Sequence, residues 1–503
     1  MRESSTILAI DQGTTSTKVL LVDAATGVVL SSCSVPVGIN YPQPGWVEQD
    51  AAAIWAGIVA AIVQVLDAAP GVTPAGLAIS NQRESVIVWS ATTGEPVGPM
   101  IGWQDARSAA WCADLPPAAA TLVTDRTGLP LDAMFSAPKL RWLLNSALAA
   151  EHDVVDLRVG TVDSWLIYRL TGNHVIEVGN ASRTLLLDTA AIGWDPALAD
   201  LFEVPVSVLP KVVPSDGPFG TVCPGVDSRL AGVPVLAVLA DSHAALYHHG
   251  RGAPGVGKAT YGTGSSVMVP LAARSPGATL AWQIDGAIQY AAEGNILTSG
   301  AGLDWLARTL GLPDGVSGGA FLSDLAEEAA DSGGVSFVPA FTGLSAPHWD
   351  RDAVGLLTGL TGGTTRAHLA RAGLEAVSHQ VADVIEALVT TDSTEEVPLE
   401  RLVADGGASA SAALMQVQAD LLGREVVVSA SPHASAFGAA DLAAYVLDKS
   451  AGLDRLDRLD RLARLDRRTE FRATFTPSLN DDERVRRRTT WEAAIRRSRS
   501  LPT

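Results

Sequence analysis

Residues 6–22 read TILAIDQGTTSTKVLLV, and this stretch decides the fold at the start of the chain. Two short apolar runs that are rich in branched side chains, 7–10 and 19–22, flank the polar segment DQGTTS at 11–16. Two such runs around a short turn that contains glycine are typical of a β-hairpin. We therefore predict a hairpin with a small turn rich in hydroxyl groups.

The predicted turn is suited to bind an anion. Gly13 lets backbone N–H groups approach a phosphate closely, and hydroxyl side chains add further donors. Asp11, at the end of the first strand, could hold Mg²⁺ directly or through water. A polar turn without a ligand is the alternative interpretation of this stretch alone. The residues predicted to contact the phosphates of a nucleotide here are Thr14, Thr15, Ser16 and Lys18.

A second copy of the pattern lies half a chain away. Residues 258–269 read KATYGTGSSVMV, which is a turn rich in glycine and threonine between two runs that are typical of strands. Internal repeats of this kind indicate related structural units. Two halves that each carry a phosphate-binding hairpin imply two lobes that face a nucleotide across a cleft.

Composition limits the possible classes of protein. The chain has 503 residues, of which 47% are hydrophobic, so two or more globular domains are expected. A formal net charge of −19 argues against a nucleic-acid partner, since the phosphate backbone would be repelled. The three cysteines are far apart and odd in number, which argues against a disulfide framework or a zinc site.

No membrane segment is expected. The apolar run at 7–10 is too short for a signal peptide. The most apolar stretch, 51–66, contains Gln64 and is shorter than the ~18 residues that a spanning helix needs. We therefore predict a cytoplasmic protein without a membrane partner.

The polar residues NQRE, 81–84, follow a strand-like run at 77–80. Residues 86–89 are predicted as the hairpin partner of that strand. A solvated turn and a ligand site are both open interpretations of these polar residues. Trp103 follows another short strand and is either core or the apolar face of a sugar or polyol site.

Asp241 comes directly after the apolar strand-like run 233–240. Carboxylates at strand ends of α/β sheets often line the ligand crevice, so Asp241 is a candidate general base. The alternative is that Asp241 caps a helix over 244–248. Further along, 252–258 nearly matches a P-loop, but Ala259 replaces the required hydroxyl residue and a strand is predicted to follow.

The order of these motifs resembles that of glycerol kinase and the wider FGGY carbohydrate kinases, over nearly the whole chain. The segments that carry the resemblance are DQGTTS at 11–16, PGWVE at 44–48, NQRE at 81–84, Trp103, MFSAPKLRWL at 134–143, NASR at 180–183, Ala240-Asp241, TYGTG at 260–264, FTG at 341–343, GLLTGL at 355–360 and DGG at 405–407. The resemblance implies an α/β fold with two ribonuclease-H-like lobes of the actin, Hsp70 and hexokinase type and a central cleft.

The resemblance also implies roles for single residues. Asp241 matches the catalytic base that takes the proton from the attacking primary hydroxyl, and Asp11 matches the carboxylate that organises Mg²⁺. The polyol-binding positions are Arg83, Glu84 and Trp103; the matching phosphate and nucleotide contacts are Thr14, Thr263, Gly300 and Gly407.

Several positions depart from glycerol kinases. Met134, Ser242 and Ser266 stand where those enzymes place Tyr, Gln and Phe around glycerol, and Asp304 and Ser411 stand where they carry Gln and Asn. No clear match to the regulatory Gly-Gly-Thr-Arg loop is found near 227–229. These changes predict an enlarged acceptor site and put feedback control in doubt.

We therefore expect an ATP- and Mg²⁺-dependent kinase that phosphorylates a primary hydroxyl of glycerol or of a four- to five-carbon polyol. A ketopentose (xylulose-type) kinase is the alternative, and an actin- or Hsp70-like ATPase is a remote one. We expect a polyol-binding lobe over 1–248 and a nucleotide-binding lobe over 249–503. The protein is predicted to form a homodimer or homotetramer.

Overall fold

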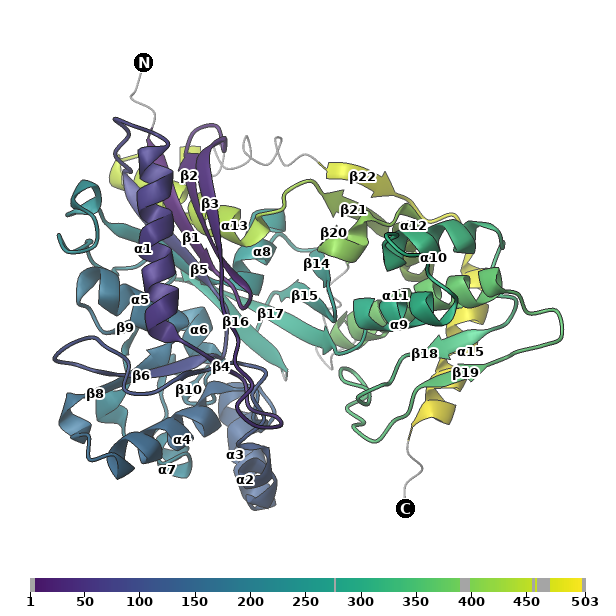
Figure 1. Cartoon of the computed structure of the whole chain (residues 1–503), viewed down its shortest axis with the longest axis horizontal. Coiled ribbons are helices and arrows are strands. Elements are labelled where there is room, and N and C mark those ends of the chain that lie inside the picture. Colours follow the sequence, from purple (N-terminus) through teal and green to yellow (C-terminus); the bar gives the residue numbers. More distant parts are fainter. Residues whose placement is uncertain (1–4, 276, 390–398, 455–456, 459–470, 500–503) are drawn as a thin grey trace. The chain divides into compact units, whose positions relative to one another are not determined.

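The computed structural model describes residues 5–275, 277–389, 399–454, 457–458 and 471–499. The chain forms two compact units, each built from segments that are separate in sequence (Figure 1). The first unit comprises Met1–Arg251, Ala273–Tyr290 and His433–Arg468, and the second comprises Gly252–Ala272, Ala291–Pro432 and Thr469–Thr503. The lobe boundary expected at residue 248 stays a prediction.

The central sheet of the first unit has the strand order β13-β5-β1-β2-β3. Its strands are β1 (Thr6–Gln12), β2 (Ser16–Asp23), β3 (Val29–Pro36), β5 (Gly76–Asn81) and β13 (Val235–Ala240). β1, β2 and β3 run antiparallel to one another in sequence order, whereas β5 is parallel to β1 and β13 is parallel to β5. The predicted hairpin at 6–22 is thus confirmed.

Helices with one apolar stripe cover this sheet. α1 (Ala51–Asp67) begins directly after Asp50, whose carboxylate caps the helix by accepting a hydrogen bond from Ala53 N at 3.0 Å. α1 packs on β2 and β3 (Figure 1). α13 (Ala434–Ser450) packs on β1, β5 and β13. The buried stripe of α1 includes Ile54, Ile58 and Ile62. Burial of these stripes fixes the sheet that carries the polar strand ends.

One strand pairing differs from the prediction. β6 (Val86–Ser90) is not the hairpin partner of β5; it lies in a separate sheet with the order β4-β7-β6-β8. The intervening Glu84 has φ 60°, a left-handed conformation that turns the chain away from β5. The other strands of this sheet are β4 (Glu48–Gln49), β7 (Met100–Ile101) and β8 (Leu157–Thr161).

The rest of the first unit consists of short helices, the two-stranded pairings β10-β11 and β12-β9, and β16, which pairs with β17. They are α2 (Ala109–Asp114), α3 (Pro117–Thr127), α4 (Ser136–Ala149), η1 (Val154–Asp156), α5 (Val162–Thr171), β9 (Val175–Glu177), α6 (Val178–Ser182), β10 (Leu187–Asp188), β11 (Gly193–Trp194), α7 (Pro196–Leu201), η2 (Val206–Val208), β12 (Lys211–Val213), η3 (Ser228–Leu230), α8 (Asp241–Gly250) and β16 (Ala278–Ile284).

The sheet of the second unit repeats the plan of the first. Its order includes β17-β15-β14-β20-β21-β22, in which β14 and β15 form an antiparallel hairpin, β20 is parallel to β14 and β21 is parallel to β20. The strands are β14 (Val256–Tyr261), β15 (Ser265–Leu271), β17 (Ala287–Ile296), β20 (Arg401–Asp405), β21 (Glu425–Ser429) and β22 (Phe471–Phe475). The internal repeat predicted from the two turns is therefore confirmed, and the P-loop-like segment runs into a strand as expected.

The helices of the second unit pack around this sheet. They are α9 (Gly300–Thr309), α10 (Gly318–Glu327), α11 (Arg366–Val389), η4 (Gly407–Ala410), α12 (Ala412–Leu422) and α15 (Asp481–Ser498), with a strand pair β18 (Ser336–Val338) and β19 (Leu356–Thr358). Among the described residues, no helix combines the length and apolar character needed to cross a membrane.

Candidate active site

Three parallel strands of the first unit end at one edge of its sheet. Gln12 of β1 lies opposite Asn81 of β5, which lies opposite Ala240 of β13. The residues just before or after these positions therefore converge, as carboxyl ends of parallel strands do. Arg83 Nε lies 3.5 Å from Asp241 Oδ1, so two predicted site residues form an ion pair here.

Asp11 and Lys18 form the second charged pair of this edge. Lys18 Nζ lies 3.8 Å from Asp11 Oδ2 across the β1–β2 hairpin. Burial is the main cause that raises the pKa of Asp11 to about 6; the Lys18 charge opposes it and the Asp241 charge adds to it. Two carboxylates close enough to repel each other are suited to a cation.

The two carboxylates Asp11 and Asp241 suit a magnesium ion that takes most of its ligands from water and substrate phosphates. No group of three or more His, Cys, Asp and Glu side chains that could hold a metal occurs among the described residues. Mg²⁺ usually keeps several waters and is held by one or two carboxylates together with substrate phosphates. Asp11 alone, or with Asp241, fits that pattern.

Asp241 is the first residue of α8, and Ala240 is the N-cap position. The alternative that Asp241 caps a helix beginning near residue 244 is therefore wrong. The Asp241 carboxylate accepts from Ser242 N at 2.6 Å, and 35% of its side chain is exposed. A partly exposed carboxylate at a strand end is placed where it could take a proton from a bound hydroxyl.

Glu84 is held in a strained and buried position. It is 4% exposed and has φ 60°. Arg183 Nε lies 2.5 Å from Glu84 Oε1, and the Arg183 guanidinium lies 5.0 Å from the centre of the Phe135 ring. A non-glycine residue in a left-handed conformation is kept only where its surroundings fix it, and such residues are common at functional sites.

Trp103 is fixed from both ends. Its indole N–H donates to Thr14 Oγ1 at 3.0 Å, and its backbone N–H donates to Ser85 Oγ at 3.1 Å. The structure thus brings Trp103 to the turn of the β1–β2 hairpin. Met134 lies in the segment before α4 and is half-buried. Thr15, exposed, and Ser16, half-buried, complete the turn, which Gly13 N closes on Ser16 O at 3.0 Å.

Buried amides, two of them in the NQRE segment, support this edge. Gln82 Nε2 donates to Gln12 Oε1 at 3.1 Å and to Gln49 Oε1 at 2.9 Å. Asn81 Nδ2 donates to Asn180 Oδ1 at 2.9 Å. The signal in the sequence is a run of amide residues inside strands that are otherwise apolar, because buried amides must pair with one another.

The β14–β15 turn of the second unit is tied to the start of α9. The backbone N–H groups of Ser299 and Ala301 donate to Thr263 O at 3.1 and 3.0 Å, and that of Gly300 donates to Gly262 O at 3.0 Å. A Cβ at residue 300 would lie 2.4 Å from Gly262 O, so only glycine permits this approach. A glycine-rich turn beside a helix N-terminus is a common arrangement for phosphate binding.

The end of β20 lies beside the same turn. Asp405 pairs with Thr260 of β14, and Gly406 has φ 85°. A Cβ at residue 406 would lie 2.5 Å from Tyr261 O. A Cβ at Gly407 would meet nothing within 4 Å, so a ligand can approach the backbone there. The structure therefore brings together Thr263, Gly300 and Gly407.

The remaining predicted residues of the second unit differ in their surroundings. Asp304 is exposed on α9. Ser411 caps α12 by accepting from Leu414 N at 3.1 Å, and its hydroxyl lies 2.6 Å from that of Ser323, so its polar capacity is largely used. Ser266 Oγ of β15 is buried and has no hydrogen-bond partner among the described residues.

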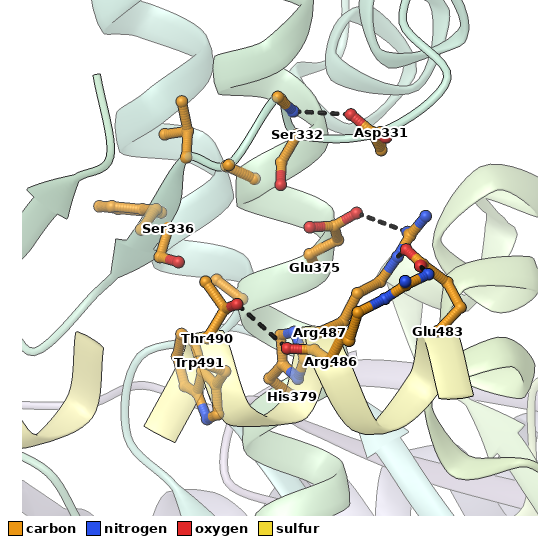
Figure 2. A pocket seen from close by; sticks show the side chains of 16 residues that line it. Asp331, Ser332, Ser336, Glu375, His379, Glu483, Arg486, Arg487, Thr490 and Trp491 are labelled. Carbon is orange, nitrogen blue, oxygen red and sulfur yellow. Dashed lines mark hydrogen bonds and ion pairs between the residues drawn. The ribbon is translucent and has the colours of Figure 1, made fainter. Parts of the chain in front are cut away.

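A pocket of about 410 Å³ lies elsewhere in the second unit, and none of the predicted site residues lines it (Figure 2). It is bounded by residues 331–337, α11 and α15. Several of its charged side chains are paired with one another, since Arg487 Nη1 lies 3.1 Å from Glu375 Oε1 and Arg487 Nε lies 2.8 Å from Glu483 Oε1 (Figure 2). These pairs attach α15 to the body of the unit.

Comparison with known proteins covers both units. Residues 6–247 match the N-terminal domain and residues 257–447 the C-terminal domain of the FGGY family of carbohydrate kinases. A glycerol kinase of Alkalilimnicola ehrlichii is 41% identical over 98% of both chains. An apulose kinase of Pectobacterium atrosepticum is 42% identical over 88% of this chain and 89% of its own. The crystal structure of Plasmodium falciparum glycerol kinase with ADP matches with a TM-score of 0.89 and 29% identity over 99% of both chains.

Proposed function

The chain belongs to the FGGY family of carbohydrate kinases and is a phosphotransferase with an alcohol group as acceptor, and from this premise we propose that it transfers the γ-phosphate of ATP to a primary hydroxyl of a small polyol. The observation that carries the proposal is the 41% identity to a glycerol kinase over 98% of both chains. The ion pair of Arg83 and Asp241 at the strand ends supports it, because such a kinase needs one base at the acceptor hydroxyl.

The proposed mechanism depends mainly on position and charge. Asp241 takes the proton of the attacking hydroxyl, and Arg83 at 3.5 Å orients its carboxylate. Glu84, held by Arg183, accepts hydrogen bonds from acceptor hydroxyls, and Trp103 packs against the carbon chain.

The nucleotide is proposed to bind through the two hairpin turns and the glycines beside them. Hydroxyl and N–H donors at Thr14 and Thr263 face phosphates, and Gly407 admits the ligand to the backbone. Asp11 would hold Mg²⁺, whose charge would offset that of the phosphates when it is bound.

We propose that the acceptor is larger than glycerol. Ser242 and Ser266 are smaller than the Gln and Phe of glycerol kinases, and Ser266 Oγ is buried without a partner among the described residues. A polar group left unpaired by the ligand discriminates against that ligand by up to ~10⁴-fold, whereas an apolar gap costs about 1–3 kcal/mol. A four- or five-carbon polyol would supply the additional hydroxyl.

The experiment compares kcat/KM for glycerol, erythritol, threitol, xylitol and arabinitol in the wild type and in Ser266→Phe. We expect a four- or five-carbon polyol to lead in the wild type and the variant to shift towards glycerol. If glycerol leads in the wild type, or if the Phe substitution leaves the order unchanged, the enlarged acceptor site is wrong and glycerol is the better substrate assignment.

A ketopentose kinase is the second candidate. The apulose kinase relative is as similar to this chain, at 42% identity, as the glycerol kinase is. Adding xylulose and ribulose to the substrate series distinguishes the two, since a higher kcat/KM for a ketose than for every polyol would favour this candidate. The homodimer or homotetramer and the cytoplasmic location stay predictions, and light scattering after gel filtration tests the former.

A further inference from the structure

Lys139 is a completely buried lysine in the first turn of α4. Its relative exposure is 0%, although lysine is almost never fully buried unless it is paired. A buried ammonium group loses its hydration, so its contacts must replace the lost hydrogen bonds. The sequence alone shows only a lysine at the start of an amphipathic helix, where the side chain would ordinarily reach water.

The ammonium group of Lys139 links two segments that carry predicted walls of the acceptor site. Nζ donates to Met134 O at 2.5 Å and lies 3.4 Å from Gly102 O. Met134 is one of these walls, and Gly102 directly precedes Trp103, which is another. Trp103 is itself fixed independently, because its indole N–H donates to Thr14 Oγ1 and its backbone N–H donates to Ser85 Oγ. Lys139 therefore holds the backbone that directly precedes Trp103.

Charged groups from three neighbouring segments face Lys139. Burial lowers its pKa to about 7, and the charges of Glu84, Asp105 and Asp132 oppose this effect, while Arg107 adds to it. Glu84 and Asp105 are already paired, with Arg183 and Arg107 respectively. The carbonyl oxygens of Met134 and Gly102 are therefore the direct acceptors of Lys139, and the carboxylates act on it through charge.

We propose that Lys139 is a positioning residue that sets the separation of Trp103 and Met134 and thereby determines the affinity for the acceptor. The inference rests on the proposed function. An ammonium group carries several N–H donors and can bridge two carbonyl oxygens, whereas a methionine of similar length donates none. Loss of the bridge lets the two wall segments move apart without removing any group that contacts the acceptor.

The test takes as acceptor the polyol or ketose with the highest kcat/KM in the substrate series above, and it measures KM for this acceptor and for ATP separately in Lys139→Met. A misplacement of about 1 Å in a binding site can reduce activity ~100-fold, so we expect KM for the acceptor to rise about 10- to 100-fold. KM for ATP should change less than about twofold, because the predicted contacts of Lys139 lie on the acceptor side. A purely structural role would instead lower the amount of active enzyme and leave both KM values unchanged.

Lys258→Met is the matched control. Lys258 is 2% exposed in β14 of the second unit, and its Nζ donates to Thr260 Oγ1 at 2.8 Å. This control removes an equally buried ammonium group and should not raise KM for the acceptor. A folded Lys139→Met enzyme with wild-type KM for the acceptor would overturn the proposal, as would an equal rise in the control.

A measurement on the wild type covers the case in which Lys139→Met does not fold. The chain has five lysines, so ¹³C-lysine labelling gives a simple NMR spectrum, in which the signal that Lys258→Met removes distinguishes the equally buried Lys258 from Lys139. We expect the Lys139 signal to shift on addition of the polyol alone, and an unshifted signal would refute the positioning role. If the wild type phosphorylates neither polyols nor ketoses, the proposed function fails. If it phosphorylates one of them but Lys139→Met keeps the wild-type KM for that acceptor, only the inference about Lys139 fails.

Discussion

Replacing Arg488 by methionine is expected to destabilise the second unit, because Arg488 attaches α15 to α11. The Arg488 side chain is 10% exposed, and Nη2 lies 2.6 Å from Asp383 Oδ1 while Nη1 donates to His379 O at 3.1 Å. Asp383 also accepts from Trp491 Nε1 at 2.7 Å. Two residues of the terminal helix thus converge on one buried carboxylate.

The expected loss of stability in Arg488→Met follows from the burial of the Arg488–Asp383 ion pair. Removing one partner of a buried ion pair leaves an uncompensated charge and costs about 3–5 kcal/mol. Because Trp491 and His348 still donate to Asp383 in the variant, the lower end of this range applies. A loss of about 3 kcal/mol lowers Tm by roughly 6–12 °C for a unit of this size.

The loss should also depend on pH. Burial raises the pKa of Asp383, yet the hydrogen bond from His348 and the charge of Arg488 outweigh it and hold the pKa below its usual value. A depressed carboxylate pKa contributes stability above the unfolded-state value and loses it as the pH falls through the folded-state value. Without Arg488 the folded-state pKa rises, so acid unfolding should begin at a higher pH.

Calorimetry and urea unfolding at pH 7 measure the effect. Arg496→Met is the matched control, because Arg496 lies on the same helix and pairs with Glu492 at 3.9 Å with both side chains more than half exposed. An exposed pair contributes at most about 1 kcal/mol. The reasoning is refuted if the two variants lose equal stability, or if Arg488→Met loses less than about 1 kcal/mol.

Two further predictions concern the first unit. Asp241→Asn should keep nucleotide binding and Tm but lose ~10²- to 10⁴-fold in kcat, and steady-state turnover above about a tenth of wild type would remove Asp241 from the role of base. Burial raises the pKa of Glu177 to about 7 in the folded state. Between the lower pKa of the unfolded state and this value, the folded state keeps a proton that the unfolded state has released. The free energy of unfolding therefore falls as the pH rises through this range. In Glu177→Gln, the free energy of unfolding measured in urea should depend less on pH between pH 5 and 7 than in the wild type. An unchanged pH dependence would show that Glu177 does not cause it.

Local patterns were sufficient to predict several elements. The helix at 51–67 and its Asp50 cap depend only on residues adjacent in sequence. The two glycine-rich hairpins share one pattern of branched runs, and the structure repeats one strand order around them. The pairing of β6 with β8 could not be predicted, because a strand after a turn has several possible partners and no local pattern encodes the left-handed conformation of Glu84 (φ 60°) between β5 and β6.

The sequence by itself determined the repeated hairpins, the strand-end positions of Asp11, Arg83 and Asp241, and the family resemblance, because these depend on short-range order and residue type. Only the tertiary structure decided which polar groups are buried and what they contact. Arg183 meets Glu84 across 99 positions and Arg488 meets Asp383 across 105. Such pairs form because a charged side chain that folding removes from water needs a partner of opposite charge. The packing of the whole chain determines which residue that is, so a pattern among neighbouring residues cannot predict a partner about a hundred positions away.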